Sequence, residues 1–253
     1  MNPLLKPGEA CGACADGIKP PFEFTMAFQP MVDLALGRIY GYEALVRGPA
    51  GEAAATVLDQ VTTSNRYAFD QSCRVKAITL ATDLGLYKTG ASLSINFIPG
   101  AMYSPEHCVR ATVVAARRHD FPLNRLVFEL TENEQITDYS HLDDIFRVYR
   151  AHNVRTAFDD FGAGFSGLSL LAHFQPDFVK IDMSLIRGLD TDSRRHAIVS
   201  GIVGICRSLS TEIVAEGVET VAELSALRAL GITLFQGYLF AKPGFEALPE
   251  VKF

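Results

Sequence analysis

Residues 155–182 read RTAFDDFGAGFSGLSLLAHFQPDFVKID, and this stretch contains two short apolar runs that each carry charged residues near their ends. The first run ends in Asp159 and Asp160, and the second contains Lys180. Both runs are rich in β-branched and aromatic residues, which is typical of buried strands. The residues between them are numerous enough for a helix, so the stretch predicts a strand–helix–strand unit with polar groups at its strand ends.

Six further runs repeat this pattern along the chain. They close on Gln29, Glu43, Asn96, Glu129, Glu216 and Gln236, in the segments FTMAFQ (24–29), RIYGYE (38–43), SLSIN (92–96), RLVFE (125–129), EIVAE (212–216) and LFQG (234–237). Eight such strands separated by helices predict an α/β fold, a TIM-like (β/α)8 barrel. In such a barrel the C-terminal ends of the strands meet at one rim, so these polar residues are expected to share one site.

The first two strands depart from a plain barrel. Only LALG (34–37) separates MVD (31–33) from the run that begins at Arg38, which is too short for a crossover helix. We therefore expect a barrel with an antiparallel first strand. Later segments show apolar residues at three- and four-residue spacing, which predicts helices over 70–84, 105–120, 140–152, 193–209 and 220–230.

The chain of 253 residues has the length of one barrel, so we expect an N-terminal arm over 1–21, flexible because it is rich in Pro and Gly, and a barrel domain over 22–253. Cys11 and Cys14 in the arm form half of a zinc site that only another chain can complete, and the alternative is a mobile arm without metal. The remaining cysteines are expected in the core: Cys73, Cys108 and Cys206.

Composition excludes several classes of function. The net charge of -6 argues against binding of polymeric nucleic acid, which usually requires clustered Lys and Arg. No apolar stretch has the length of a membrane span, and the first residues lack the apolar core of a secretion signal. The sequence therefore predicts a cytoplasmic protein without membrane association, for which a small phosphorylated ligand stays open if metal ions supply positive charge.

Glu43, Asn96, Glu129 and Asp159 offer carboxylate and amide oxygens and no histidine, which favours Mg²⁺ or Mn²⁺ over zinc or copper. The adjacent pair Asp159 and Asp160 reaches one site only if the strand ends there, and the glycine-rich FGAGFSG (161–167) supplies that turn. A shared carboxylate, with Glu216 as a further ligand, suits two metal ions per site acting in phosphoryl chemistry. Calcium is expected to bind without supporting turnover, and so to inhibit.

Lys180 lies within an apolar run, where an unpaired ammonium group is costly. It is expected either to orient an attacking water and stabilise phosphate charge, or to form an ion pair with Asp182. Gln29 and Gln236 offer amide hydrogen bonds to a ligand, and Arg47 can bind a phosphate through its planar guanidinium group.

These residues lie in a series of motifs that resembles the EAL domain, the cyclic-di-GMP phosphodiesterase family. The resemblance runs from Phe24 to Lys242 in the family's order: FQP, EALVR, SIN, ELTE, DDFGAGFSG, VKID, AEGVE and QGYLF. The loop reads DDFGAGFSG where many members have DDFGTGYSS. The segments GPAGE (48–52) and NRYAFDQ (65–71) resemble the branch found beside blue-light-sensing domains.

The resemblance implies hydrolysis of cyclic di-GMP to linear pGpG in bacterial second-messenger signalling. It implies a first metal on Glu43, Asn96, Glu129 and Asp159 and a second on Asp159, Asp160 and Glu216. Lys180 would position the water, so that Glu43, Asp160, Lys180 and Glu216 form the catalytic set. It further implies that Glu132 tethers the glycine-rich loop, although a solvated glutamate is the alternative, and that the chain forms a homodimer.

Two other functions remain open at this point. A catalytically silent EAL receptor would bind the same ligand and pass a signal to a regulatory partner that the sequence does not identify. An unrelated barrel enzyme acting on sugar phosphates is the third reading, which the lack of a distinct phosphate loop after the seventh strand weakens.

Overall fold

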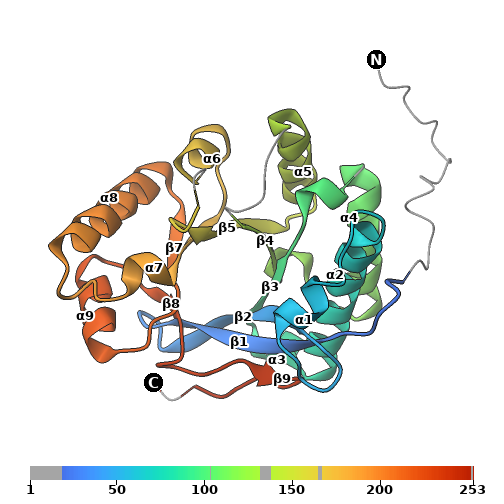
Figure 1. The fold of residues 1–253 in the computed structure, drawn as a ribbon, viewed down its shortest axis with the longest axis horizontal. Coiled ribbons are helices and arrows are strands. Elements are labelled where there is room, and N and C mark those ends of the chain that lie inside the picture. Colours follow the sequence, from blue (N-terminus) through green and yellow to red (C-terminus); the bar gives the residue numbers. More distant parts are fainter. Residues whose placement is uncertain (1–18, 103, 132–137, 165–166, 252) are drawn as a thin grey trace.

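The computed structural model describes residues 19–102, 104–131, 138–164, 167–251 and 253, and Figure 1 looks into the barrel that these residues form. The barrel strands are β1 (Thr25–Asp33), β2 (Arg38–Arg47), β3 (Ser92–Asn96), β4 (Leu126–Thr131), β5 (Arg155–Phe161), β6 (Phe178–Ile181), β7 (Glu212–Ala215) and β8 (Leu234–Gln236). All eight overlap a predicted run, so the predicted α/β, TIM-like barrel is confirmed.

The first strand closes the barrel in the predicted antiparallel sense. Strands β2 to β8 are parallel neighbours in sequence order, and β1 pairs antiparallel with both β2 and β8. In this register Gln29 lies opposite Glu43, and Met31 lies opposite Gln236. A short strand β9 (Gly244–Phe245) adds to the far end of β1.

Helices surround the barrel on its outer side (Figure 1). The five predicted ones are α2 (Arg66–Asp83), α4 (Pro105–Arg118), α5 (Tyr139–Ala151), α8 (Ser193–Leu209) and α9 (Val221–Ala229). Pro105 occupies the first turn of α4, and the Thr220 side chain caps α9 by accepting from the Glu223 N–H group. The bounds of the helices of seven residues or fewer were not predicted, because such helices are too short to show a period, although a helix was expected between β5 and β6. These short helices are α1 (Ala54–Leu58), α3 (Leu86–Thr89), α6 (Gly167–His173) and α7 (Met183–Ile186).

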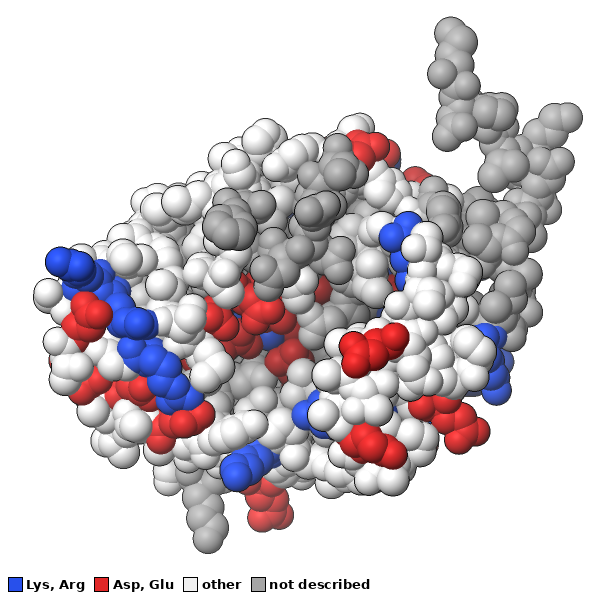
Figure 2. Space-filling view, in the orientation of Figure 1, with Lys and Arg blue, Asp and Glu red and all other residues white. Residues whose placement is uncertain are grey.

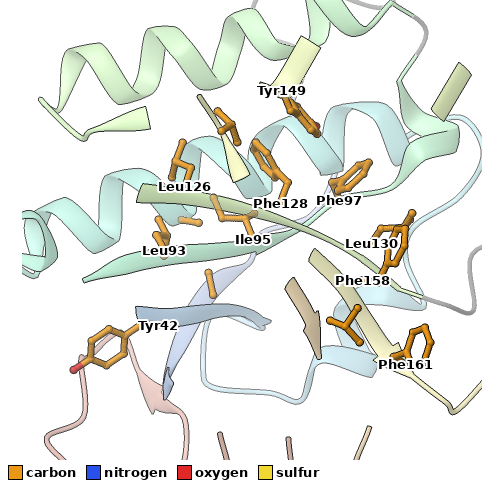
Figure 3. Close-up of a cluster of buried hydrophobic side chains, with 14 of the residues drawn as sticks. Tyr42, Leu93, Ile95, Phe97, Leu126, Phe128, Leu130, Tyr149, Phe158 and Phe161 are labelled. Carbon is orange, nitrogen blue, oxygen red and sulfur yellow. The ribbon is translucent and has the colours of Figure 1, made fainter. Parts of the chain in front are cut away.

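The main core lies between the strands and the helices. Side chains alternate between the two faces of a strand, so Leu126, Phe128 and Leu130 of β4 all point outward to the helices (Figure 3). Tyr149 of α5 packs against them. The three cysteines predicted in the core, Cys73, Cys108 and Cys206, are buried and free.

The inner face of the barrel has two layers of different chemistry. The lower layer is apolar and contains Met31, Val127, Ala157, Phe178, Val214 and Leu234. Two residues further along five of these strands, and therefore on the same face, the side chains are polar. These residues are Glu129, Asp159, Lys180, Glu216 and Gln236.

Some predictions fall on residues that the structure does not describe. Residues 1–18, with Cys11 and Cys14, and Glu132 lie outside the described residues, so the arm over 1–21, its metal and the loop tether stay predictions. Within the described part of the chain, every helix is too short or too polar to span a membrane.

Candidate metal centre

The polar layer is buried at the rim formed by the C-terminal ends of the strands. Glu43, Glu129, Asp159, Lys180 and Gln236 each expose 6% or less of their surface. They come from five strands that surround the barrel axis, and their side chains point toward that axis. Figure 2 shows acidic side chains gathered in a hollow near the centre of this face. The structure thus brings together residues that are up to 193 positions apart in sequence.

Lys180 occupies the centre of this layer. Its Nζ atom lies 3.2 Å from Glu43 Oε2, 2.8 Å from Glu129 Oε2, 2.9 Å from Asp159 Oδ1 and 2.7 Å from Glu216 Oε1. The alternative that Lys180 pairs with Asp182 is therefore wrong. Asp182 lies one residue beyond the end of β6, and its carboxylate accepts from the Ser184 N–H group at 2.8 Å to cap α7.

Three amide side chains complete the layer around Glu43. Asn96 Nδ2 donates to Glu43 Oε1 at 3.1 Å, and Gln236 Nε2 donates to Glu43 Oε2 at 2.7 Å. The same Gln236 nitrogen lies 3.2 Å from Gln29 Oε1. Asn96, Gln29 and Gln236 therefore lie where the sequence predicted them, beside the carboxylates.

Burial and mutual repulsion raise the pKa values of Glu129 and Glu216. The pKa of Glu129 is raised to about 8, chiefly by burial, and the charges of Glu43 and Asp159 add to the rise while Lys180 opposes it. Burial, reinforced by Asp159, also raises the pKa of Glu216 well above its usual value. Burial alone would lower the pKa of Lys180, but the surrounding carboxylates outweigh it and raise that pKa. The layer is thus short of positive charge, because one ammonium group faces four carboxyl groups.

Several oxygen atoms in the layer have no hydrogen-bond partner among the described residues. Asn96 Oδ1, Glu129 Oε1 and Gln236 Oε1 are buried in this way. Two carboxylate triads also have oxygens within 4.8 Å of one another, Glu43–Glu129–Asp159 and Asp159–Asp160–Glu216. Unpartnered oxygens beside excess negative charge fit a hard divalent cation, and the shared Asp159 fits a pair of cations.

Asp160 reaches the site through a break in the strand. Its φ angle is 54°, a left-handed conformation within β5, and its carbonyl oxygen accepts from the Ala163 N–H group in the turn that follows the strand. The pairing of β5 with β6 is also irregular between Phe158 and Phe161. The sequence predicted that the strand ends at this pair, but β5 continues to Phe161 and the glycine-rich turn begins only after it. The left-handed backbone of Asp160 itself lets the adjacent carboxyl groups face one site. Burial beside Asp159 raises the pKa of Asp160 to about 6.

Arg47 lies at the outer edge of the site. It is the last residue of β2 and shares the inner face with Glu43, because the two are four positions apart on one strand. Its Nη1 atom donates to the Val46 carbonyl oxygen at 2.7 Å. The structure therefore places Arg47 above the carboxylate layer rather than within it.

The sequence analysis did not predict one buried ion pair near the site. Asp70 and Arg74 of α2 form an ion pair with 2.7 Å between Oδ2 and Nη2, and both are essentially fully buried. Their signal was present: two opposite charges four residues apart, on the same helix face as Ala77 and Ala81.

Comparison with known proteins places this geometry in a family. The family model described as "EAL domain" matches residues 21–243. A standalone EAL protein from Vibrio cholerae O395, solved in its cyclic-di-GMP-bound form, superposes with a TM-score of 0.88 at 50% identity, covering 92% of this chain and 97% of that one. The manganese and cyclic-di-GMP complex of BlrP1 from Klebsiella pneumoniae gives a TM-score of 0.85 at 35% identity, covering 92% of this chain and 59% of that one.

Curated relatives carry more than one kind of name. The blue light- and temperature-regulated antirepressor BluF of Escherichia coli K12 is 31% identical over 239 residues, which is 94% of this chain and 58% of BluF. Two other relatives are named "Probable cyclic di-GMP phosphodiesterase PdeD", from Escherichia coli K12, and "Cyclic di-GMP phosphodiesterase PA2567", from Pseudomonas aeruginosa. This chain spans less than two thirds of the length of BluF and of these other relatives.

Proposed function

This chain belongs to the EAL domain family, and we propose that it is a metal-dependent phosphodiesterase that hydrolyses cyclic di-GMP to linear pGpG. The observation that carries the proposal is the polar layer itself. It keeps a complete oxygen-donor set around Lys180, and three of its buried oxygens have no partner among the described residues.

We assign the metal ligands from the two carboxylate triads. Glu43, Asn96, Glu129 and Asp159 would hold one cation, and Asp159, Asp160 and Glu216 would hold the other, as Mg²⁺ or Mn²⁺. Bound divalent cations would neutralise charge on the scissile phosphate and make an attacking water more acidic. The relative solved with manganese and cyclic di-GMP supports this choice of metal and ligand.

The chain's own residues then orient the reactants. Hydrolysis forms a bond between phosphorus and the water oxygen, breaks the bond from phosphorus to one 3′ oxygen, and delivers a proton to that oxygen. Lys180 would orient the water through its N–H donors and stabilise the added negative charge. Gln29 and Gln236 would form amide hydrogen bonds to the ligand, and Arg47 would bind a phosphate from above the carboxylate layer.

A second candidate function is a receptor that binds cyclic di-GMP without hydrolysing it. The name of BluF, an antirepressor, favours keeping this candidate. The retained donor set argues for catalysis, because a receptor has no need of both carboxylate triads.

Incubation of the purified chain with cyclic di-GMP, followed by chromatography, separates the two candidates. The enzyme should yield pGpG with Mg²⁺ or Mn²⁺, and none with a chelator, with Ca²⁺ alone or after Glu43→Gln. A receptor would bind cyclic di-GMP by calorimetry yet leave it intact under all of these conditions.

We propose three further properties from the family resemblance. They are a homodimer, a cytoplasmic location, and a role in second-messenger signalling under an upstream regulator. The unpartnered apolar residues of α8 support the dimer, since Ile198 and Ile205 expose 51% and 39% of their surface.

A further inference from the structure

The buried pair Asp70 and Arg74 lies behind the metal centre, between α2 and the strands. Burying two opposite charges costs desolvation energy that their attraction does not reliably recover, so such a pair is weak evidence of a stabilising role. The contacts that the pair makes with its remaining polar atoms are therefore the informative feature.

Asp70 holds the backbone that follows Asn96. While Oδ2 pairs with Arg74, Oδ1 accepts from the Ile98 N–H group at 2.9 Å. The N–H group of Phe97, between Asn96 and Ile98, donates to the Glu129 carbonyl oxygen at 3.0 Å. The two peptides after Asn96 are thus fixed from opposite sides, one by β4 and the other by α2.

Arg74 pairs with Asp70 and packs against Phe128 of β4, the strand that carries Glu129. Its Nη1 atom donates to the Tyr149 hydroxyl at 2.8 Å, and its guanidinium carbon lies 4.7 Å from the centre of the Phe128 ring. Tyr149 stacks on Phe128 with ring centres 4.7 Å apart, and Figure 3 shows the two rings together with Phe97. Phe128 directly precedes Glu129, so this cluster spans the backs of both β3 and β4.

We propose that Asp70 is a positioning residue that fixes Asn96 and Glu129 relative to each other for binding of the first cation, with Arg74 as its anchor. This inference rests on the proposed function, because it assigns a metal to those two side chains. Asn96 and Glu129 already lie opposite each other in the β3–β4 register. Asp70 adds an acceptor that neither strand supplies, for the N–H group of Ile98 two residues beyond the end of β3.

The test compares two double variants that differ only in the acceptor. Asp70→Asn/Arg74→Met removes both charges but keeps an oxygen for the Ile98 N–H group. Asp70→Leu/Arg74→Met removes the charges and the oxygen at similar volume. Apolar replacement of a buried ion pair is often tolerated, so both are expected to fold.

Mn²⁺ binding is measured by calorimetry without substrate, and melting temperature is measured in chelator. Loss of a group that holds a metal ligand in place typically costs about 10- to 100-fold in metal affinity, so the Leu variant should bind Mn²⁺ at least tenfold more weakly than the Asn variant. Tyr149→Phe is the matched control in the same cluster: it should lower the melting temperature and leave Mn²⁺ affinity within about twofold, because the Asp70–Ile98 bond remains.

Hydrogen exchange of the wild-type chain provides a test without substitution. The Ile98 amide should be protected in chelator as strongly as with Mn²⁺, since Asp70 holds it before any metal binds. Equal Mn²⁺ affinity in the two double variants, or an unprotected Ile98 amide in chelator, would overturn the inference while leaving hydrolysis by the wild-type chain intact. A wild-type chain that neither binds Mn²⁺ nor hydrolyses cyclic di-GMP would instead overturn the proposed function, and this inference with it.

Discussion

Lys180 shows how a single residue organises the site. An ammonium group in the barrel interior is stable only among acids, and four carboxyl groups that close to one another repel unless a cation lies between them. The apolar run FVKID predicted the need for a partner but not its identity. The Asp182 alternative assumed that strand alternation continues, whereas β6 ends at Ile181 and Asp182 caps the helix α7.

The first prediction separates metal binding from chemistry at this residue. Lys180→Met should lower the turnover of cyclic di-GMP by at least about a hundredfold, because the group that orients water and stabilises charge is lost. Mn²⁺ should still bind, since every proposed ligand remains. Lys76→Met, on the exposed side of α2, is the control and should keep its rate. A near-normal rate in Lys180→Met would make that lysine purely structural.

The second prediction concerns pH. In the metal-free protein Glu129 has a pKa of about 8 and Asp160 of about 6, so both hold protons below those values. A cation must displace these protons to bind, and affinity for Mn²⁺ should therefore rise with pH from 6 to 8. The expected slope is about tenfold per pH unit for each displaced proton. Calorimetric titrations at pH 6, 7 and 8 measure it, and an affinity that is flat or falls with pH would contradict the assigned ligands.

At the scale of elements, helix α7 packs against two turns beside proposed ligands of the second cation. One turn follows Asp160 and the other follows Glu216. A side chain on Gly162, in the turn after Asp160, would collide with Leu185 of α7. A side chain on Gly217, directly after Glu216, would collide with Met183 of the same helix. This helix therefore packs closely on both turns, and glycine is required at each.

The third prediction uses two glycines with the same backbone strain. Gly217 and Gly188 have φ angles of 62° and 67°, but a side chain at Gly188 meets nothing closer than 3.8 Å. Each alanine substitution should cost about 1–2 kcal/mol from the left-handed backbone alone. Gly217→Ala should in addition weaken Mn²⁺ binding by moving Glu216, whereas Gly188→Ala should not. Equal Mn²⁺ affinity in the two variants would show that α7 does not position Glu216.

Elements of different length were predictable to different degrees. The strand runs and the five long helices carried clear periods, and the polar residues closing the runs located the rim. The helix expected between β5 and β6 could not be given bounds, and α7 was missed, because four to seven residues show no period. The ion pair between α2 residues Asp70 and Arg74 was missed for another reason: a helix pattern does not tell which charges lie buried when the partner surface is unknown.

At the scale of the whole molecule, closure of the barrel creates the site. Seven parallel strands bring their C-terminal ends to one rim, and the antiparallel β1 still contributes Gln29 because its residues run in the opposite direction along the same face. The apolar layer below supports the polar layer above. Sequence alone could predict which residues meet, but the distances around Lys180 depend on the closed barrel.

The fourth prediction concerns assembly. Helix α8 lies on the outer edge of the molecule (Figure 1), and its exposed Ile198 and Ile205 flank Gly201 and Gly204, which have open space around them. A second copy is expected to cover this face. Light scattering should therefore give a dimer mass for the wild-type chain and a monomer mass for Ile198→Glu/Ile205→Glu. A monomeric wild-type chain with full activity would contradict the dimer.

The most direct test of the central claim is a reaction in water labelled with oxygen-18. Wild-type chain, cyclic di-GMP and Mn²⁺ are mixed, and the mass of the product is measured by mass spectrometry. We predict pGpG carrying one labelled oxygen on its terminal phosphate, formed with Mn²⁺ and absent in chelator. Recovery of intact cyclic di-GMP, or of a product without the label, would contradict hydrolysis at this carboxylate rim.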